Sequence, residues 1–394
     1  MALIERNIEI LTFLRYYLPG YKSGGPIRTL ANMVQTLSNE LCFYIVTSDR
    51  DFGDKNPYKN IEPHRWTSVD KAWVYYVPPS SQNIFHWKRI IKNTPHDVLY
   101  FNSLFNLRFT LLPLIAAKLL KASDKPIVVA PRGELFPGAL SFKKMIKSLF
   151  LVLTRITKLY DKVIWQASSI EEVEVIKKHY GRSVEVCIAP NIADKIAEDI
   201  VSVATNETNR QLKLVFLSRI VKKKNLDFAL DTLTFVNTKL DFHIYGTIED
   251  KEYWEKCQEK INSLPPHIRT EYKGHLLYEE VIKTLKNYDL FLFPTRSENY
   301  GHVIVEALSA GVPVLISDQT PWKDLEKEKV GWTLPLSLGP NGFARIINET
   351  AESILKDRHA WRKRCIDYVK RKTQDQSVIQ ANLDLFRTAL KISR

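Results

Sequence analysis

Two glutamates with a defined spacing are the most informative feature of the sequence. Glu298 and Glu306 lie eight residues apart within DLFLFPTRSENYGHVIVEALSAGVPVLISD, residues 289–318. DLFLFP predicts a buried strand that stops at Pro294, and HVIVEALSA predicts a short helix that ends at Gly311. Because the first turn of a helix carries unpaired N–H groups and partial positive charge, it can hold a diphosphate. The flanking carboxylates could then accept hydrogen bonds from sugar hydroxyls on one side and ribose hydroxyls on the other.

The alternative is that both glutamates are solvated surface charges, as most glutamates are. Glu306, however, is flanked by Val305, Ala307 and Leu308 on a helix that should be largely buried between two strands. A carboxylate in such surroundings needs partners of its own, which favours a binding role.

Two further groups could act on a diphosphate. Arg219 and Lys224 follow the apolar run LKLVFLS, and cations at that place could neutralise a departing diphosphate. A solvated basic turn is the alternative. Gly24 and Gly25 form a turn between an apolar strand and a helix-like segment, where backbone N–H groups could approach a phosphate or a sugar. A purely structural turn would have the same sequence.

Alternating strands and helices must position these groups. One series fills residues 1–195, a polar linker 196–211, a second series 212–370, and a last helix at 371–394 is expected to pack back toward the first domain. This alternation predicts two doubly wound parallel sheets that bind ligands at the carboxyl ends of their strands. The expected strands are IEILTFL, CFYIVTS, AWVYYV, DVLYFN, PIVVAP, KVIWQAS, then LKLVFLS, DFHIYG, TEYKGH, DLFLFP and PVLISD; the helices in the first series include 106–121 and 141–160.

The E-x7-E pair and the run ALSAGVPV after it resemble the signature of retaining glycosyltransferases of family 4 (group 1). SRIVKKKNL resembles the family's R-x4-K element with Arg219 and Lys224, and HIYGTIED resembles its strand that ends at Gly246. APNIAD, residues 189–194, resembles its Pro-Asn element at the domain junction. The resemblance covers the C-terminal half almost throughout, and the N-terminal half chiefly at the glycine turn and in strand order.

The resemblance implies the GT-B fold, in which two Rossmann-like domains face each other across a cleft. It places the nucleotide-sugar donor on the C-terminal domain and the acceptor on the N-terminal one, with no metal and no other cofactor. It implies Glu298, Arg219 and Lys224 as catalytic residues. The implied donor contacts are Gly24, Gly25, Gly246, Asn299, Tyr300, Gly301, His302, Val303 and Glu306.

Two strand ends depart from the family pattern. The family usually ends an N-domain strand with a His that faces the donor sugar, whereas PIVVAPRGELF places Arg132 there. Similarly, DVLYFN ends in Asn102 where a His is common. Because an Arg cannot act as a general base, we expect Arg132 to bind a phosphate or acidic group, and Glu134 to orient the acceptor.

Metal chemistry has one candidate motif. Asp49 and Asp51 form a D-x-D pair, which binds a metal–nucleotide complex in GT-A glycosyltransferases. The pattern is frequent by chance and follows the second strand of a GT-B-like domain, so ordinary loop residues are the preferred interpretation. No His/Cys/Glu cluster predicts zinc, and no Walker lysine loop appears. The four cysteines are scattered, which predicts free thiols in a reducing compartment.

The sequence therefore predicts transfer of a sugar, with retention, from a nucleotide-diphosphate sugar to a saccharide or lipid-linked saccharide in cell-surface polysaccharide or glycoconjugate synthesis. No side chain is an obvious nucleophile, so the leaving phosphate is the candidate base. A GT-B-fold epimerase or phosphorylase is the alternative enzyme. The net charge of +13 also suits a non-enzymatic basic membrane-binding protein. Nothing interleaves aromatic and basic residues as RNA modules do, so no nucleic acid partner is predicted.

The positive charge gathers in one segment, since residues 118–162 hold ten Lys or Arg against three acids. Ser141 is a plausible cap for a helix over 141–160 with an apolar and a basic stripe, which suits an anionic membrane surface. A core helix with a solvated basic face is the alternative. The N-terminus reads as a strand rather than a signal peptide, and no run reaches the roughly 20 apolar residues of a bilayer span. We therefore expect a cytoplasmic protein that docks on the inner leaflet. The apolar stripe is Phe142, Met145, Leu149, Val152, Ile156 and Leu159, and the basic stripe is Lys144, Lys147, Arg155, Lys158 and Lys162.

Overall fold

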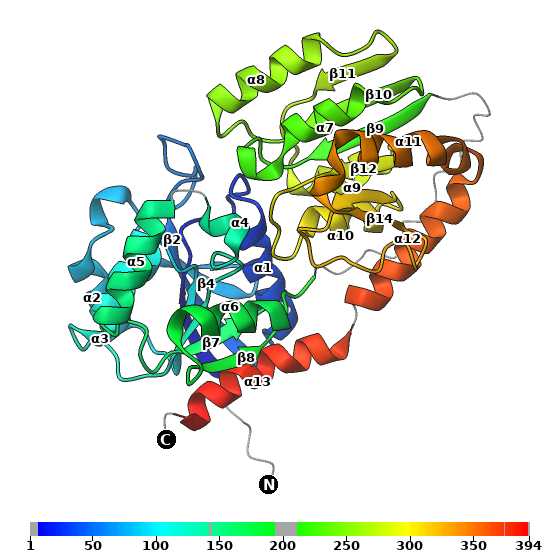
Figure 1. Cartoon of the computed structure of the whole chain (residues 1–394). Helices are drawn as coiled ribbons and strands as arrows, with labels where there is room; N and C mark the ends of the chain where they lie inside the picture. The colour runs from blue at the N-terminus through cyan, green and yellow to red at the C-terminus, as the bar shows by residue number, and fades with distance from the viewer. Residues whose placement is uncertain (1–6, 142–143, 194–210, 374, 393–394) are drawn as a thin grey trace. The chain divides into compact units, whose positions relative to one another are not determined.

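The computed structural model describes residues 7–141, 144–193, 211–373 and 375–392 (Figure 1). The chain divides into two compact units, the first made of Met1–Ile192 with Asp375–Arg394 and the second of Ala193–Gln374. Each unit has its own hydrophobic core. The expected linker, 196–211, lies outside the described residues except for its last residue.

The first unit is built on an eight-stranded sheet with the order β3-β4-β2-β1-β5-β6-β7-β8. Neighbouring strands are parallel except β3 and β4, which are antiparallel. The strands are β1 (Ile8–Phe13), β2 (Leu41–Ser48), β3 (Trp66–Val69), β4 (Ala72–Val77), β5 (Val98–Asn102), β6 (Ile127–Ala130), β7 (Ile164–Ala167) and β8 (Glu185–Ile188).

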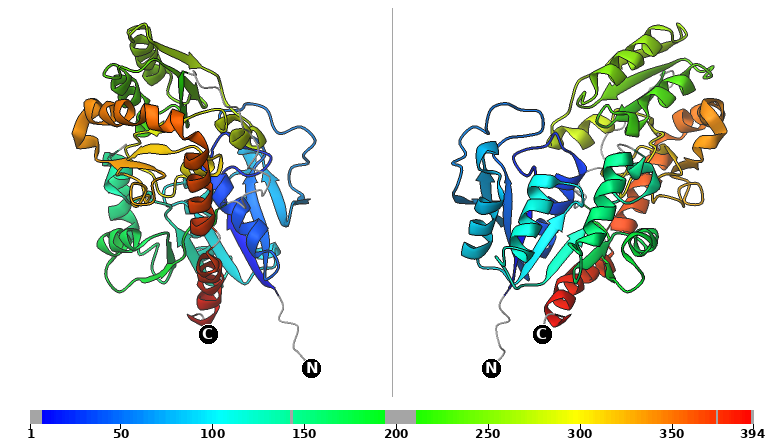
Figure 2. Two further views of the ribbon diagram at one scale, coloured as in Figure 1. Left: turned by 90° about the vertical axis from the view of Figure 1, so that its right-hand side faces the viewer. Right: turned by 60° about the vertical axis from the view of Figure 1, so that its left-hand side comes forward.

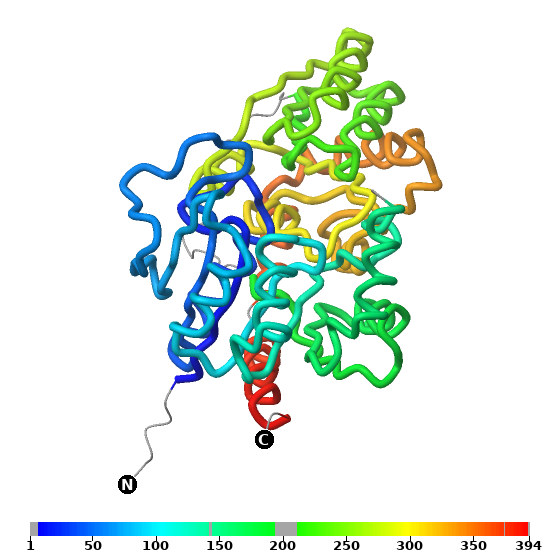
Figure 3. The backbone as a smooth tube through the Cα atoms, turned by 90° about the vertical axis from the view of Figure 1, so that its left-hand side faces the viewer, coloured from blue at the N-terminus to red at the C-terminus, as the bar shows by residue number. Residues whose placement is uncertain are grey.

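Helices cover both faces of this sheet (Figures 1 and 2). Alternate residues of β1 point into two cores, because side chains alternate along a strand. Ile10 packs with α1 and α13, and Leu11 packs on the side of α2 and α3. The last helix, red in Figure 3, therefore completes the first unit. The helices are α1 (Gly25–Leu37), α2 (Ile84–Asn93), α3 (Leu112–Lys118), α4 (Pro137–Leu140), α5 (Lys144–Ile156), α6 (Ile170–Tyr180) and α13 (Gln376–Ile392), with a π-helical turn at Leu107–Leu111 before α3.

The second unit is a six-stranded, wholly parallel sheet with the order β11-β10-β9-β12-β13-β14. The strands are β9 (Leu212–Leu217), β10 (Leu240–Tyr245), β11 (Ile268–Tyr272), β12 (Leu290–Phe293), β13 (Val314–Ser317) and β14 (Gly331–Leu334). The helices are α7 (Leu226–Leu233), α8 (Lys251–Asn262), α9 (Tyr278–Leu285), α10 (His302–Ser309), α11 (Gly339–Lys356) and α12 (Arg358–Thr373). Two doubly wound α/β units confirm the predicted fold class.

Three strands were not predicted, and all three lie at sheet edges: β3, β8 and β14. An edge strand is buried on fewer sides, so its burial is incomplete even where its residues are apolar. None of the four residues of β3 or of β8 is fully buried, whereas every residue of β5 is. The expected helix at 106–121 is also divided, because the π-helical turn Leu107–Leu111 precedes the α-helical Leu112–Lys118.

A fully buried asparagine fixes the last helix to the first unit. Asn382 on α13 is 0% exposed, and its amide donates to the carbonyl oxygens of Pro190 at 2.8 Å and Val378 at 2.9 Å. Its Oδ1 accepts a hydrogen bond from Gln166 on β7 at 3.4 Å. The side chain thus joins the returning helix to the segment where the chain leaves the first unit.

Asn382→Ala should lower the free energy of unfolding of the first unit by about 1–3 kcal/mol, because buried hydrogen-bonding groups lose their partner. The matched control is Gln380→Ala on the exposed side of the same helix, which removes only an exposed bond to Asp384. Urea unfolding of both variants measures the difference. Equal stabilities would show that Asn382 does not hold the helix in place.

Candidate active site

Three loops of the second unit meet at the carboxyl edge of its sheet, where β9, β10 and β12 end. Backbone hydrogen bonds join them. The N–H of Ile220 donates to the carbonyl of Thr247 at 2.9 Å, and the N–H of Arg296 donates to the carbonyl of Lys223 at 2.9 Å. The loop after β9 is therefore fixed to both of its neighbours.

Lys224 and Glu298 form an ion pair within these loops, with Lys224 Nζ donating to Glu298 Oε2. Their side chains are only 11% and 18% exposed. Lys224 Nζ also lies 5.4 Å from the ring centroid of Phe293, and the N–H of Glu298 donates to the carbonyl of Gln319 at 2.9 Å. Two of the three predicted catalytic residues are thus in direct contact.

The surroundings of Glu298 determine its charge. Burial raises the pKa of the carboxyl, but the hydrogen bond and positive charge of Lys224, with Lys223 and His302 nearby, outweigh this effect. The pKa of Glu298 therefore lies below its usual range. The group is a carboxylate at neutral pH, able to accept hydrogen bonds from hydroxyls and unable to act as a general acid.

Helix α10 begins directly after this pair. Gly301 precedes it with φ of 83°, and a side chain there would come within 2.8 Å of the Ile304 side chain. The carbonyl of Gly301 accepts from the N–H groups of Ile304 at 2.8 Å and Val305 at 3.2 Å. The N–H groups of His302 and Val303 lie earlier in the first turn, where helix geometry supplies no carbonyl within the helix.

The remaining predicted donor contacts of this segment surround the same turn. The carbonyl of Tyr300 accepts from the indole N–H of Trp322 at 2.6 Å, and its ring lies 4.8 Å from that of His302. The N–H of Asn299 donates to the Glu298 carboxylate at 3.3 Å. Glu306, on α10, is only 8% exposed, which excludes a solvated surface charge.

Gly246 lies at the end of β10 with φ of 148°, and a Cβ there would come within 1.7 Å of the Ser218 carbonyl oxygen. Only glycine allows these two loops to approach so closely. Arg219, the third predicted catalytic residue, donates from one nitrogen to both carboxylate oxygens of Glu249, at 3.0 and 3.1 Å. Arg219 is thus paired with Glu249, as Lys224 is with Glu298, and Glu249 is a partner that the sequence analysis missed although it lies three residues after Gly246.

The first unit holds Arg132 at the end of β6 with φ of 54°, a left-handed conformation. Its guanidinium donates to Asn102 Oδ1 at 2.9 Å, and also to the hydroxyl of Tyr100 and to Asn191 Oδ1. These bonds stay inside the first unit and tie the ends of β5 and β6 together. The guanidinium thus has several partners within the first unit, and its expected contact with a phosphate or acidic group stays a prediction.

Glu134 is also engaged internally. Its carboxylate accepts from the N–H of Leu104 at 2.5 Å and from the hydroxyl of Ser103 at 3.0 Å. Burial raises the pKa of this carboxyl above its usual range. Glu134 therefore shapes the loop after β5, so any effect on an acceptor would pass through that loop.

The glycine turn of the first unit adopts the expected position. Gly24 precedes α1 with φ of 68°, and Gly25 is the first helical residue. No atom lies within 4 Å of where a Gly24 Cβ would be. The turn is therefore a helix start with open space in front of it.

The D-x-D pair supports this turn. One oxygen of Asp51 accepts from the N–H of Tyr21 at 2.8 Å and the other from the N–H of Phe52 at 2.7 Å. Asp49 accepts from Arg50 at 2.8 Å. Both carboxylates thus have roles in shaping the loops. Within the described part of the chain, no group of three or more His, Cys, Asp or Glu could hold a metal ion.

The family model for glycosyl transferases group 1 matches residues 195–372. Over these residues, which span nearly all of the second unit, the chain is similar to glycosyl transferases group 1. One relative is an uncharacterised 41.2 kDa protein in the cps region of Klebsiella pneumoniae, to which the chain is 27% identical over 239 residues. The alignment covers 58% of this chain and 62% of that protein. It is 22% identical over 294 residues to the sulfoquinovosyl transferase SQD2 of Arabidopsis thaliana, covering 67% and 56%. Both alignments span less than two thirds of the relative's length.

The fold of the chain is similar to that of solved structures. HepE from Anabaena, in complex with UDP and glucose, matches with a TM-score of 0.70 at 15% identity, covering 97% of this chain and 99% of that one. The GT-B fold expected from the sequence is confirmed by this similarity. Identity this low shows the fold alone.

In the second unit, Lys224→Met should lower the free energy of unfolding by about 3–5 kcal/mol at pH 7, because it leaves the buried Glu298 carboxylate without its cation. The pKa of Glu298 is held low in the folded protein. Its ion pair therefore stabilises above the unfolded pKa of about 4.3 and is lost as pH falls through the folded pKa. The variant and the wild type should accordingly converge in stability in acid.

Chemical denaturation between pH 3 and 8 measures this convergence. Lys222→Met is the control, because it removes an equal charge from an exposed side chain in the same short turn. A loss that is independent of pH, or equal in the two variants, would contradict the role assigned to the pair.

Proposed function

We propose that this protein is a retaining hexosyltransferase that moves a sugar from a nucleotide-diphosphate sugar to a saccharide or lipid-linked saccharide in the synthesis of cell-surface polysaccharide or glycoconjugate. The observation that carries the proposal is the buried Lys224–Glu298 pair at the start of α10, within the residues that match the group 1 family model. Burying an ion pair costs desolvation energy. Here the arrangement places a carboxylate and a cation beside helix N–H groups, which suits a sugar diphosphate.

The proposed roles follow from this geometry. The N–H groups of His302 and Val303, the helix dipole and Lys224 stabilise negative charge on the diphosphate. Glu298 accepts hydrogen bonds from the sugar, and Glu306 from the ribose. The bond from the sugar anomeric carbon to the phosphate oxygen breaks, and a bond to the acceptor oxygen forms on the same face. The acceptor proton passes to the departing phosphate.

The relatives support the class of substrate. HepE is bound to UDP and glucose, so UDP-glucose is the first donor to test. The Klebsiella relative is encoded in a cps region and SQD2 is a sulfoquinovosyl transferase, which fits a saccharide or lipid acceptor. A GT-B-fold epimerase is the alternative that product analysis must separate, since it would convert the sugar without an acceptor.

A panel of UDP-, GDP- and ADP-sugars tests the proposal by thermal unfolding, because a ligand that binds the folded state raises its stability. The donor that protects is then incubated with saccharide and lipid-linked acceptors, and the anomeric configuration of the product is read by NMR. An inverted linkage would contradict retention. Release of an isomerised sugar without acceptor would instead establish the epimerase.

Glu306→Gln should weaken binding of that donor by about 1.5–3 kcal/mol, because ribose hydroxyls lose a charged acceptor. Glu298→Gln should lower kcat more than it weakens donor binding. Calorimetry and initial rates separate the two effects, with the exposed Glu279→Gln on α9 as the control. Wild-type donor affinity in Glu306→Gln would remove this residue from the ribose role.

Transfer should continue in excess EDTA, because Lys224 and the start of α10 supply the positive charge that a metal would otherwise provide. Initial rates with and without chelator measure this. If EDTA abolished transfer and manganese restored it, a metal role for Asp49 and Asp51 would replace this part of the proposal.

We also propose that α5 docks the protein on an anionic membrane surface. Within the described helices, none is long and apolar enough to cross a bilayer. On α5 only Leu151 and Thr154 are buried, and the side facing solvent is apolar. Lys144 and Arg155 are exposed beside this surface. The exposed apolar side chains are Met145 (86%), Ile146 (69%), Leu149 (60%), Val152 (52%), Leu153 (51%) and Ile156 (73%).

This surface differs in detail from the predicted stripes. Leu159 is buried, and Lys147 donates to the carbonyl of Ala139 at 2.6 Å, so neither is available to a lipid. Ser141 ends α4, and its hydroxyl donates to the carbonyl of Gly138 at 2.9 Å. Phe142 lies outside the described residues. The solvent side of α5 carries apolar side chains as well as Lys144 and Arg155, which supports docking over a core helix with a solvated basic face.

Replacing Met145, Leu149 and Ile156 together by Gln should reduce cosedimentation with vesicles of phosphatidylglycerol and phosphatidylcholine at least tenfold, because each buried apolar side chain contributes about 1.5–3 kcal/mol. Lys144→Gln with Arg155→Gln should lose less, about 1 kcal/mol per cation, and only at low salt. The control replaces the similarly exposed Leu107, Leu119 and Ile170 by Gln. Equal vesicle binding by the triple variant and its control would refute docking through α5.

A further inference from the structure

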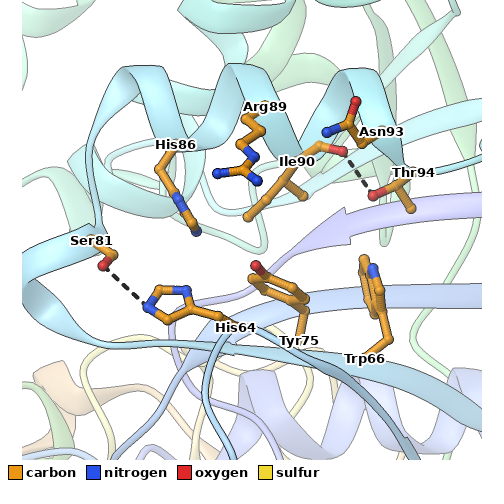
Figure 4. Close-up of a pocket in the computed structure, with 9 residues that line it drawn as sticks. All are labelled: His64, Trp66, Tyr75, Ser81, His86, Arg89, Ile90, Asn93 and Thr94. Carbon is orange, nitrogen blue, oxygen red and sulfur yellow. Dashed lines mark hydrogen bonds between the residues drawn. The ribbon is translucent and has the colours of Figure 1, made fainter.

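A separate pocket of about 440 Å³ lies at the edge of the first sheet, between the β3–β4 pair and α2 (Figure 4). It lies wholly within the first unit and shares no residue with the site described above. Its size falls in the range of small-molecule sites. The lining residues are His64, Trp66, Tyr75, Ser81, His86, Arg89, Ile90, Asn93 and Thr94.

One side of the pocket is aromatic. Trp66 on β3 and Tyr75 on β4 are paired across the antiparallel strands and point to the same face, with ring centroids 5.2 Å apart. Both are only partly buried, because α2 does not extend over the edge strand. Aromatic faces left half-covered at a sheet edge offer a platform for the apolar face of a ligand.

The opposite side is polar and carries positive charge. Figure 4 shows Arg89 and His86 reaching from α2 toward the strands, with His64 below them. The Nε2 atom of His86 is buried and has no hydrogen-bond partner among the described residues. His64 accepts or donates a hydrogen bond with the Ser81 hydroxyl at 3.3 Å, which leaves its Nδ1 as a further polar group. The wall therefore has one buried imidazole nitrogen without a partner, on His86, and a second imidazole nitrogen on His64.

The charge of the pocket is one-sided. None of the lining residues is a carboxylate, and over the described ranges no carboxylate forms an ion pair with Arg89. A neutral ligand would leave this guanidinium unused, whereas a carboxylate could pair with it in two parallel hydrogen bonds. A bare phosphate would satisfy Arg89 but would make no use of the Trp66–Tyr75 platform.

We propose that this pocket binds an acidic saccharide unit, a hexuronic acid whose ring packs on Trp66 and Tyr75 and whose carboxylate pairs with Arg89. His86 and Asn93 serve the ring hydroxyls. The pocket would hold a part of the acceptor polymer other than its reacting end. This inference rests on the proposed function in one respect, that the acceptor is a saccharide.

The test measures binding to the full chain without any transfer reaction. Methyl glucuronide and methyl glucoside differ only in the carboxylate, and inorganic phosphate and UDP are the further probes. Binding is followed by NMR of protein with isotope-labelled histidine rings, through the signals of His64 and His86. The variants His64→Gln and His86→Gln assign these two signals. The expected result is that methyl glucuronide shifts both signals at millimolar concentration, and that methyl glucoside binds at least tenfold more weakly.

Arg89→Gln should weaken glucuronide binding about tenfold or more, because it removes a charged hydrogen bond. Lys92→Gln is the matched control, since it removes an equal charge from an exposed position on the same helix outside the pocket. Trp66→Leu should weaken both sugars alike. Donor affinity should stay at the wild-type value in all three variants.

Several results would overturn the inference. Equal binding of the two glycosides would remove the acidic specificity. A saccharide site would be excluded if phosphate or UDP alone displaced glucuronide, as followed by these signals. It would also be excluded if no saccharide shifted the signals. Failure of the proposed function would appear separately, because then no nucleotide sugar would protect the protein against thermal unfolding. That outcome would leave glucuronide binding at this pocket unaffected.

Discussion

The geometry of the candidate site depends on one constraint, that all six strands of the second sheet run parallel. Parallel strands bring their carboxyl ends to a single edge, so loops distant in the sequence must meet there. The Asn225 amide, which donates to the carbonyl of Pro294 at 2.8 Å, shows how tightly two of them are joined. Gly246 lets a third loop approach within contact of Ser218. Lys224 and Glu298 lie 74 residues apart in the sequence, and this fixed edge is what brings the two side chains together in a buried position.

That ion pair explains why the sequence was informative in this unit. E-x7-E and R-x4-K are local patterns, and each residue they name follows a strand whose end is fixed by the sheet. The partner of such a residue could be predicted only where the partner itself belongs to one of these patterns. Glu249, in the loop after β10, forms an ion pair with Arg219. The spacing of the two residues in the sequence does not predict that they pair. Edge strands were missed for a related reason, since β3 and β8 are short, four-residue strands without a fully buried residue.

The first unit shows the limit of assigning roles from residue type. Arg132 and Glu134 carry charges at a sheet edge, which from sequence indicates ligands. In the structure they organise the protein itself. Arg132 bonds to Tyr100 and Asn102, and Tyr100 in turn donates to Gln166 at 2.6 Å, so the polar residues inside apolar strands form one network. A single Gln within KVIWQAS gives little indication of such a network until the strands are placed side by side. At this edge of the first unit the charged and polar side chains therefore bond to one another and to the neighbouring loops.

Helix α5 illustrates the same limit for periodicity. A repeat of 3.6 residues shows that a helix has faces, but it does not say which face meets the sheet. On α5 both sides are largely apolar, so the pattern alone fits a core helix as well as a docking helix. In the structure Leu151 and Thr154 are buried, whereas Met145, Leu149 and Ile156 are exposed. An apolar solvent face bordered by cations is costly for a protein that meets only water. The exposure of this face thus carries more information about what the protein meets than the net charge does.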